Sequence, residues 1–359
     1  MKIQKHILRA TLISFLILFS STSTFGENVQ ENVQEKYNPT PDILHHIQDS
    51  HEWHFWGKGD ESVTIHLPII LYTSGEKSFF STLSKKGHLD VFMSSEFHHG
   101  SSDFQKGDRI YSIDHDGNIT EKEGGYIIDL SITKNVASMF ISVLLLFLLL
   151  RKTASSYKNT KQAPKGIQAF LEPLVLFVRD DIIKSNIGPK HEKYTMFLLT
   201  VFFFILINNL TGLLPGSANV TGNISVTVVL SVFTLVITNF SGNKGYWKHI
   251  IKPPGAPAAL LPIMIPVEIF GVFTKPFALM IRLFANITAG HIIILSLVSL
   301  IFVASNNGVN AGAGWSVAPL SVIFVLFIMM IELLVAFLQA YIFTLLSAVF
   351  IGLAVKEDH

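Results

Sequence analysis

The chain has 359 residues, of which 49% are hydrophobic and only 15% are charged, and its mean hydropathy is +0.46. Soluble domains contain about a quarter charged residues, so this composition excludes an ordinary soluble protein. The 27 basic and 26 acidic side chains nearly cancel, and neither the charge nor the pI of about 7.9 indicates nucleic-acid binding. Because the chain has no cysteine, disulfides, thiolate metal sites and a cysteine nucleophile are excluded.

Residues 1–26 have the three parts of a secretory signal peptide. Basic residues at positions 2, 5 and 9 precede an apolar core, Thr11–Phe19, and small residues lead up to Gly26. The apolar core is too short for a membrane span of about 20 residues. We expect the signal peptide to be cleaved, with a retained signal anchor as the alternative. In both cases the residues that follow are delivered outside the cytoplasm.

Residues 27–131 form a polar extension, which we expect to lie outside the membrane. It begins with the tandem repeat ENVQENVQE, and residues 27–136 carry 18 acids and 9 bases. From about residue 63, short β-branched and aromatic runs are separated by Gly and Asp turns, which predicts a small β-rich module. The expected strand regions are residues 63–67, 77–83, 89–93, 109–113 and 126–132.

The extension also holds nine of the fourteen histidines. Three close pairs invite a metal-site interpretation, namely His45/His46, His51/His54 and His98/His99. Histidines scattered over an acidic surface are usually solvated, and no fixed spacing with carboxylates stands out. We therefore expect no metal site in the extension.

Residues 132–359 are predicted to form an all-α polytopic membrane domain, because residues 253–355 contain only four charged side chains in 103 positions. The expected spans are residues 132–150, 196–214, 224–240, 261–303 and 318–355, and residues 166–187 form an amphipathic surface helix. The last two segments exceed the roughly 20 residues needed to cross upright. They must tilt, bend at Pro266 or Pro276, or lie partly in the membrane plane.

The charges of the loops predict the orientation in the membrane. Residues 151–193 carry 9 bases and 4 acids, and the loop after the third span carries Lys244, Lys248 and Lys252. The positive-inside rule places both of these segments in the cytoplasm. The uncharged loops 215–223 and 304–317 then lie outside, and the C-terminus is cytoplasmic. The signal peptide predicts the same orientation independently.

Ionisable side chains inside the spans are the candidate functional residues, because each costs about 2.5–3.5 kcal/mol in lipid. At about 100° per residue, Glu268, Arg282 and Asn286 fall on one face of their helix, together with Lys275. His291 falls on the opposite face. Simpler interpretations are that Arg282 or Lys275 extends its charged end to a membrane interface.

Glu332 and Gln339 are seven residues apart on the last helix and share a face. The last two helices are antiparallel, and we take Arg282 to be level with Gln339. His291 and Glu332 then lie at matched depth on the outer side, and Glu268 lies about 21 Å inward of Arg282. A buried structural pair is the alternative role for His291 and Glu332.

The decapeptide RLFANITAGH, Arg282–His291, followed by Glu332 and Gln339, resembles subunit a of the F-type ATP synthases. The similarity covers about residues 135–355 and includes Glu172-Pro173 and the segment Asn209–Pro215. It implies a non-catalytic stator subunit of a proton-driven rotary motor in a bacterial cell inner membrane. The implied partners are a ring of small proteolipid c subunits, peripheral-stalk b subunits and a catalytic ATPase head, and no cofactor is implied.

The resemblance also implies roles for single residues. Arg282 separates two half-channels, Glu268 belongs to the inner one, and His291 with Glu332 forms the outer pair, with the acid and the histidine exchanged relative to many family members. Gly212 stands where many members carry an acid. The residues implied in proton translocation are Arg282, Glu268, Asn286, His291, Glu332 and Gln339, and the candidates for the outer half-channel are Asn209, Thr221 and Asn223.

The main alternative is a secondary transporter with an ion site near the membrane midplane. Such transporters are built from internal repeats, and no repeat is visible in this sequence. An enzyme is disfavoured, because the chain has no G-x-x-x-x-G-K motif for ATP phosphates and no metal or nucleophile motif stands out. Protons are the expected ion, and we expect their conduction not to require residues 27–131.

Overall fold

A computed structural model describes residues 37–56, 63–74, 78–84, 87–100, 103–114, 117–122, 125–156, 166–214, 216–251 and 261–356. The predicted signal peptide and the tandem repeat lie outside these residues. The chain divides into two compact units, residues 1–37 and residues 38–359, and all the elements below belong to the second.

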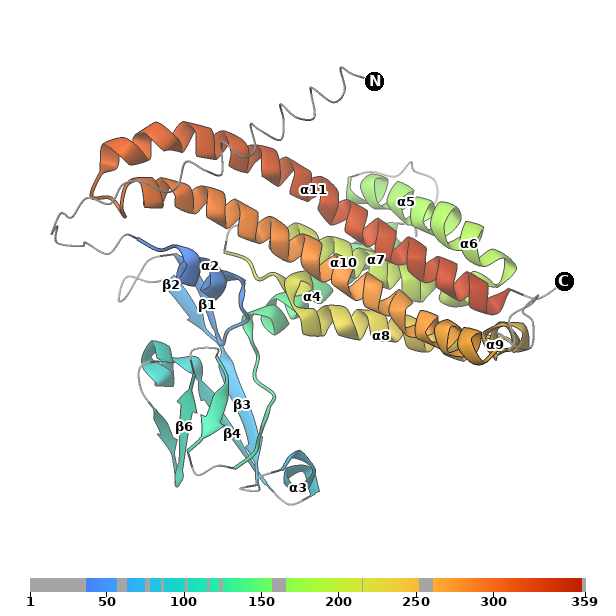
Figure 1. The fold of residues 1–359 in the computed structure, drawn as a ribbon, viewed down its shortest axis with the longest axis horizontal. Coiled ribbons are helices and arrows are strands. Elements are labelled where there is room, and N and C mark those ends of the chain that lie inside the picture. Colours follow the sequence, from blue (N-terminus) through green and yellow to red (C-terminus); the bar gives the residue numbers. More distant parts are fainter. Residues whose placement is uncertain are drawn as a thin grey trace, which may run out of the picture. The chain divides into compact units, whose positions relative to one another are not determined.

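The extension folds into three small antiparallel sheets (Figure 1). The first pairs β1 (Glu52–Trp56) with β2 (Val63–His66). The second places β3 (Pro68–Thr73) between β4 (His88–Met93) and β8 (Ile127–Asp129). The third places β6 (Arg109–Ile113) between β5 (Phe104–Lys106) and β7 (Ile119–Glu121). The helical elements are α2 (Thr40–Ile47), α3 (Phe79–Ser84) and the 3₁₀ helix η2 (Ser94–Gly100).

The core of this module follows from the alternation of β3. Ile69 and Leu71 are fully buried and pack with Phe92, Phe97 and Tyr111. The hydroxyl of Tyr111 donates to Asp90 at 2.7 Å. Burial and this hydrogen bond raise the pKa of Tyr111 to about 12. The β-rich module predicted from the sequence is therefore confirmed.

The expected strand regions, however, are wrong at one segment and omit four strands. Residues 77–83 were expected to form a strand, but Phe79–Ser84 is the helix α3. The amide of Thr82 donates to the carbonyl of Ser78 at 2.9 Å, a helical hydrogen bond that a strand cannot make. The expected regions also omit β1, which lies before residue 63 and pairs with β2, and the strands β3, β5 and β7.

The remainder of the chain is helical, and its apolar helices match the predicted spans. Among the described residues, four helices are long and apolar enough to cross a membrane, or up to five if α8 and α9, bent by 102°, form one span. The elements are α4 (Lys134–Ser156), α5 (Ile167–Phe177), the π-helical η3 (Val178–Lys184), α6 (Ser185–Ile187), η4 (Gly188–Lys190), α7 (Glu192–Gly212), η5 (Val220–Gly222), α8 (Ile224–Phe240), α9 (Lys244–Ile251), α10 (Leu261–Ala304) and α11 (Ala311–Val355).

The helices α10 and α11 run side by side as a long antiparallel hairpin (Figure 1). The helix α10 continues through both Pro266 and Pro276. The helix α11 begins at Ala311, seven residues before the predicted start, because the side chain of Asn310 accepts a hydrogen bond from the amide of Ala313. A turn with positive φ at Asn306 and Asn307 precedes this cap.

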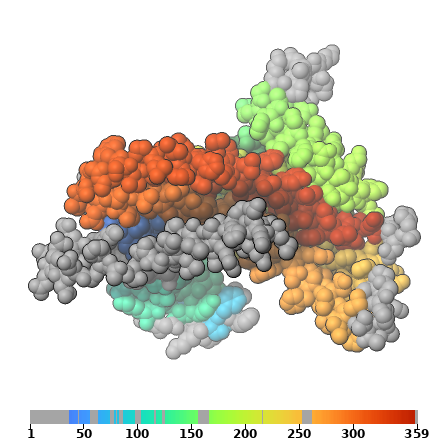
Figure 2. Space-filling model, turned by 45° about the horizontal axis from the view of Figure 1, so that its top comes forward, coloured from blue at the N-terminus to red at the C-terminus, as the bar shows by residue number. Residues whose placement is uncertain are grey.

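The core of the helical part lies between α7 and the C-terminal half of α11. Leu198 and Phe202 are fully buried on α7 and share one apolar cluster with Phe343 on α11. Small residues allow close packing here, since a Cβ on Gly352 would overlap the backbone carbonyl of Asn186. Many large apolar side chains of the hairpin are exposed among the described residues, and Figure 2 shows orange and red atoms of α10 and α11 at the surface of the molecule.

Candidate functional site

The face of α10 that carries Arg282 is turned away from the rest of the chain. Arg282 and Asn286 are exposed, whereas Leu283 and Ile287, on the other side of the helix, are buried. Within the described residues, the guanidinium of Arg282 has neither a hydrogen bond nor an ion pair. Glu268 is half-buried.

The surroundings of this face are apolar and partly small. Alanines are exposed on both sides of Arg282, at positions 278, 285 and 289. Lys275 is also exposed, and its Nζ lies 5.7 Å from the ring centre of Phe350. The large exposed side chains of the hairpin near Arg282 include Phe273, Phe277, Ile281, Leu334, Phe337 and Leu338. An apolar surface with a single unpaired guanidinium is therefore available to another molecule.

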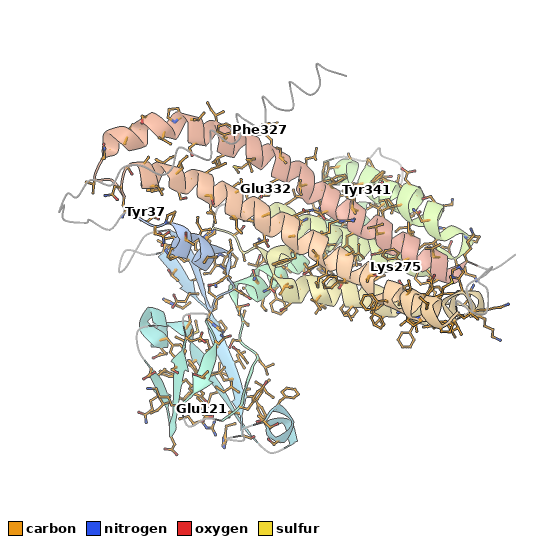
Figure 3. The ribbon with its side chains drawn as sticks, in the orientation of Figure 1. Tyr37, Glu121, Lys275, Phe327, Glu332 and Tyr341 are labelled. Atoms are coloured by element: carbon orange, nitrogen blue, oxygen red, sulfur yellow. The ribbon has the colours of Figure 1, made fainter. Side chains whose placement is uncertain are left out.

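Glu332 and Gln339 are buried, with exposed fractions of only 9% and 4%. Figure 3 places Glu332 between α10 and α11. The carboxylate lies directly over Gly290, because a Cβ on that glycine would overlap Oε1 of Glu332. The other oxygen, Oε2, is buried without a hydrogen-bond partner in the described part of the chain.

His291 is half-buried next to this carboxylate position. A Cβ on Gly212, at the end of α7, would lie 4.0 Å from Nε2 of His291. Glu332 lies over Gly290, the residue before His291, which is the matched depth expected from the sequence. Among the described residues, however, His291 and Glu332 form no direct ion pair.

The candidate outer-channel residues are partly brought together. The hydroxyl of Thr221 donates to Oδ1 of Asn209 at 2.6 Å, and Nδ2 of Asn209 donates to the carbonyl of Ala336 at 3.0 Å. Ala336 is four residues from Glu332, one helical turn away. Asn223 lies apart from this group, and its Nδ2 is 3.4 Å from Oδ2 of Asp49 in the extension.

Sequence reasoning missed a second polar group, between α8 and α11. The hydroxyls of Thr234 and Ser347 are 3.3 Å apart, and both are buried. A cavity of about 20 Å³ borders Thr234, Thr238 and Lys275, which is room for about one water molecule. A sequence signal for this group does exist, since the buried residues Thr227, Ser231, Thr234 and Thr238 of α8 recur at spacings of four, three and four residues, the period of one helix face.

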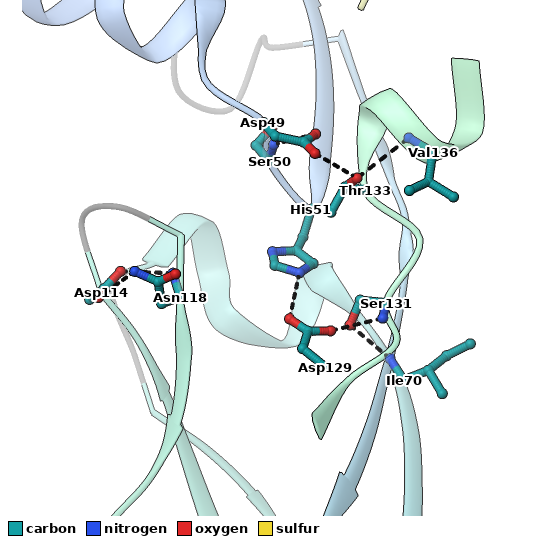
Figure 4. Close-up of polar contacts among 10 residues, drawn as sticks. All are labelled: Asp49, Ser50, His51, Ile70, Asp114, Asn118, Asp129, Ser131, Thr133 and Val136. Atoms are coloured by element: carbon teal, nitrogen blue, oxygen red, sulfur yellow. Dashed lines mark hydrogen bonds and ion pairs between the residues drawn. The ribbon is translucent and has the colours of Figure 1, made fainter. Parts of the chain in front are cut away.

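Sequence reasoning also missed the polar group where the extension meets α4. Figure 4 shows His51 directed at Asp129 and Asp49 bonded to the hydroxyl of Thr133. Burial opposes the ionisation of Asp129, but the contact with His51 and the hydrogen bonds from Ser131 outweigh it and lower the pKa of Asp129. His51 had been considered only as a metal ligand, and within the described ranges no three histidine or carboxylate side chains converge to hold a metal ion.

Comparison with known proteins gives two family matches. The family described as "ATP synthase A chain" matches residues 136–352, and a domain of unknown function matches residues 42–88.

Similar curated proteins carry the same family name. An ATP synthase subunit a of Chloroherpeton thalassium is 50% identical over 244 residues, covering 66% of this chain and 70% of that protein. An ATP synthase subunit a 2 of Chlorobaculum tepidum is 51% identical over 237 residues, covering 64% and 65%. An ATP synthase subunit a of Myxococcus xanthus is 46% identical over 239 residues, covering 65% and 75%. With the apolar helices and the family match over residues 136–352, these similarities show that the chain belongs to the ATP synthase A chain family.

Proposed function

We propose that this chain is the proton-translocating subunit a of a rotary F-type ATP synthase. It acts as the stator against a ring of c subunits, held by peripheral-stalk b subunits, while the ATP chemistry takes place in the catalytic head. The observation that carries this proposal is the exposed, unpaired Arg282 on the apolar face of a helix long enough to cross a membrane. Membership in the family supports it.

The chemistry of a guanidinium suits this role. A charge against lipid costs about 2.5–3.5 kcal/mol, so Arg282 needs an anionic partner, which the described part of its own chain does not supply. Because arginine keeps its proton at any physiological pH, it favours the ionised form of a carboxylate that moves past it. The exposed alanines around Arg282 let a helix of the ring approach closely. Each ring carboxylate would therefore release its proton as it reaches Arg282.

Two half-channels then lie on opposite sides of Arg282 along α10. His291 is nine residues away, or about 14 Å, and Glu268 is fourteen residues away in the other direction, or about 21 Å. His291 and Glu332, with Asn209 and Thr221, form the outer path. Their imidazole and carboxyl groups can pass protons at near-neutral pH.

On the inner side, Glu268 is assisted by the hydroxyl residues between α8 and α11, including Thr234 and Ser347. The positive charge of Arg282 repels hydronium and so prevents direct leakage between the two paths. We place the protein in a bacterial cell inner membrane, with the signal peptide removed, the extension in the periplasm and the C-terminus in the cytoplasm.

The substitution Arg282→Ala tests the proposal. We expect ATP-driven acidification of inverted membrane vesicles to fall to background, while the amount of assembled complex stays unchanged. Arg282→Lys should fail as well, because an ammonium group lacks the planar fork and can lose its proton when buried. The matched control is Arg179→Ala, since Arg179 is exposed and pairs with its neighbour Asp180 at 2.8 Å. Normal pumping by assembled Arg282→Ala complexes would refute the proposal.

A further inference from the structure

A cavity of about 500 Å³ lies where the extension meets α4 and α8. The extension contributes Asp49, His51 and Asp129 to its wall, and the helices contribute Asn223 and Ser225. The cavity is thus lined by ionisable groups of the extension on one side. On the other side it is lined by Asn223, which the sequence predicts to belong to the outer half-channel.

The ionisable groups of the cavity are held in fixed positions. His51 is only 6% exposed, its Nε2 lies 3.5 Å from Oδ2 of Asp129, and its Nδ1 is buried with no hydrogen-bond partner among the described residues. Asp49 accepts hydrogen bonds from the hydroxyl of Thr133 at 2.8 Å and from the amide of Asn135 at 3.2 Å. The cavity that His51, Asp49 and Asp129 line is large enough to hold water molecules.

The extension is bonded to the helices at several points around this cavity. The indole of Trp53 donates to the carbonyl of Gly216 at 2.7 Å, and the ammonium of Lys134 donates to the carbonyl of His46 at 2.9 Å. The helix α2 packs against α10. These contacts hold the cavity next to the membrane helices.

A polar route leads from the cavity toward Glu332. Asn223 contacts Asp49 at 3.4 Å and follows η5 directly in the chain. In η5, Thr221 bonds to Asn209, which in turn bonds to the carbonyl of Ala336, one turn from Glu332. The hydroxyl of Thr288, three residues before His291, also donates to η5, at the carbonyl of Gly222.

We propose that the extension forms the entrance of the outer half-channel. Protons enter through the cavity, and His51, Asp129 and Asp49 exchange protons with the water inside it before they reach His291 and Glu332. This proposal rests on the proposed function of the chain. It replaces the expectation from the sequence that conduction does not require the extension, because the extension contacts the helices around this cavity.

The absence of cysteine allows a direct test of access, because a cysteine introduced at Ser225 is the only thiol in the chain. The complete ATP synthase with Ser225→Cys is reconstituted in liposomes and treated with a bulky, membrane-impermeant maleimide. We expect labelled complexes to lose most of their proton flow. The control is Ser78→Cys, an exposed position of the extension outside the cavity. Unchanged flow after full labelling at Ser225→Cys would overturn the proposed entrance.

A second test removes the titrating groups and keeps their polarity. We expect the double variant His51→Gln with Asp129→Asn to carry less proton flow than the unaltered complex at alkaline external pH and to regain it at acidic pH. The control is Asp103→Asn, which removes an exposed carboxylate paired with Lys122. If the double variant does not assemble, His51→Gln alone should give a smaller change in the same direction.

The outcomes of this second test separate the two proposals. Equal flow at every external pH in an assembled variant would show that these groups do not serve the entrance. If the unaltered complex carries no protons at all, the proposed function fails instead.

Discussion

A single methyl group at Gly290 tests the geometry of the candidate outer site. In a helix interior alanine is normally more stabilising than glycine by about 1 kcal/mol. At this position, however, a Cβ would overlap Oε1 of Glu332 and lie 3.2 Å from its Cγ. Overpacking of this kind costs about 1–3 kcal/mol, so it cancels or exceeds the helix gain. We therefore expect Gly290→Ala to leave stability unchanged or slightly reduced, and to displace the Glu332 carboxylate.

The functional effect should be much larger than the effect on stability. Displacing a reacting group by about 1 Å can slow a reaction roughly a hundredfold, so ATP-driven proton pumping by Gly290→Ala complexes should fall by about that factor. Adding Glu332→Asp, which shortens the side chain by one methylene, should restore part of the pumping. The matched control is Gly312→Ala, where the new Cβ meets only Oδ1 of Asn310, at 3.8 Å. Full pumping together with a raised thermal midpoint in Gly290→Ala would refute this account of Glu332.

Two further predictions concern Tyr111 in the extension and Gly212 at the end of α7. The pKa of Tyr111 is raised to about 12, so its neutral form stabilises the folded module fully below the unfolded pKa of about 10, and this contribution is lost as pH rises toward 12. In an alkaline absorbance titration, one of the eight tyrosines should ionise last. The substitution Tyr111→Phe should remove that last step. An unchanged titration in the variant would contradict the assignment to Tyr111. Gly212→Asp should fold and place a carboxylate within reach of His291, since the nearest atoms to a Cβ there are 3.9–4.0 Å away. The pH optimum of proton flow should then move to higher pH. Loss of the assembled complex would show that the protein has no room for a carboxylate at position 212.

The helices of the membrane domain were predictable because their signal is long and simple. Apolar runs and loop charges located α4, α7, α8, α10 and most of α11 to within a few residues. The start of α11 was missed because it depends on one capping side chain, Asn310. The composition of the surrounding loop is compatible with a helix that begins at any of several residues. The error at Phe79–Ser84 has a similar origin, since a short run of aromatic and β-branched residues does not distinguish a strand from one or two turns of helix.

The candidate site was predictable to the extent that depth along two helices defines it. Counting residues along the two helices predicted that Glu332 and His291 lie at the same depth. This count could not predict that the carboxylate of Glu332 lies over Gly290, because that contact depends on how α11 is rotated against α10. The group of Asp49, His51 and Asp129 was beyond sequence reasoning for another reason: β8 brings Asp129 back to the start of β1, and no local spacing records that pairing.

The exposed face of α10 has a consequence for the fate of newly made chains. A copy that inserts without a partner leaves Arg282 against lipid, at a cost of about 2.5–3.5 kcal/mol. A partner that offers a carboxylate to this face binds only the folded chain and stabilises it by mass action. The half-life of the chain in the cell should therefore depend on the supply of its partner. Surplus copies would be the preferred substrates of membrane proteases, so that degradation itself keeps the subunits in proportion.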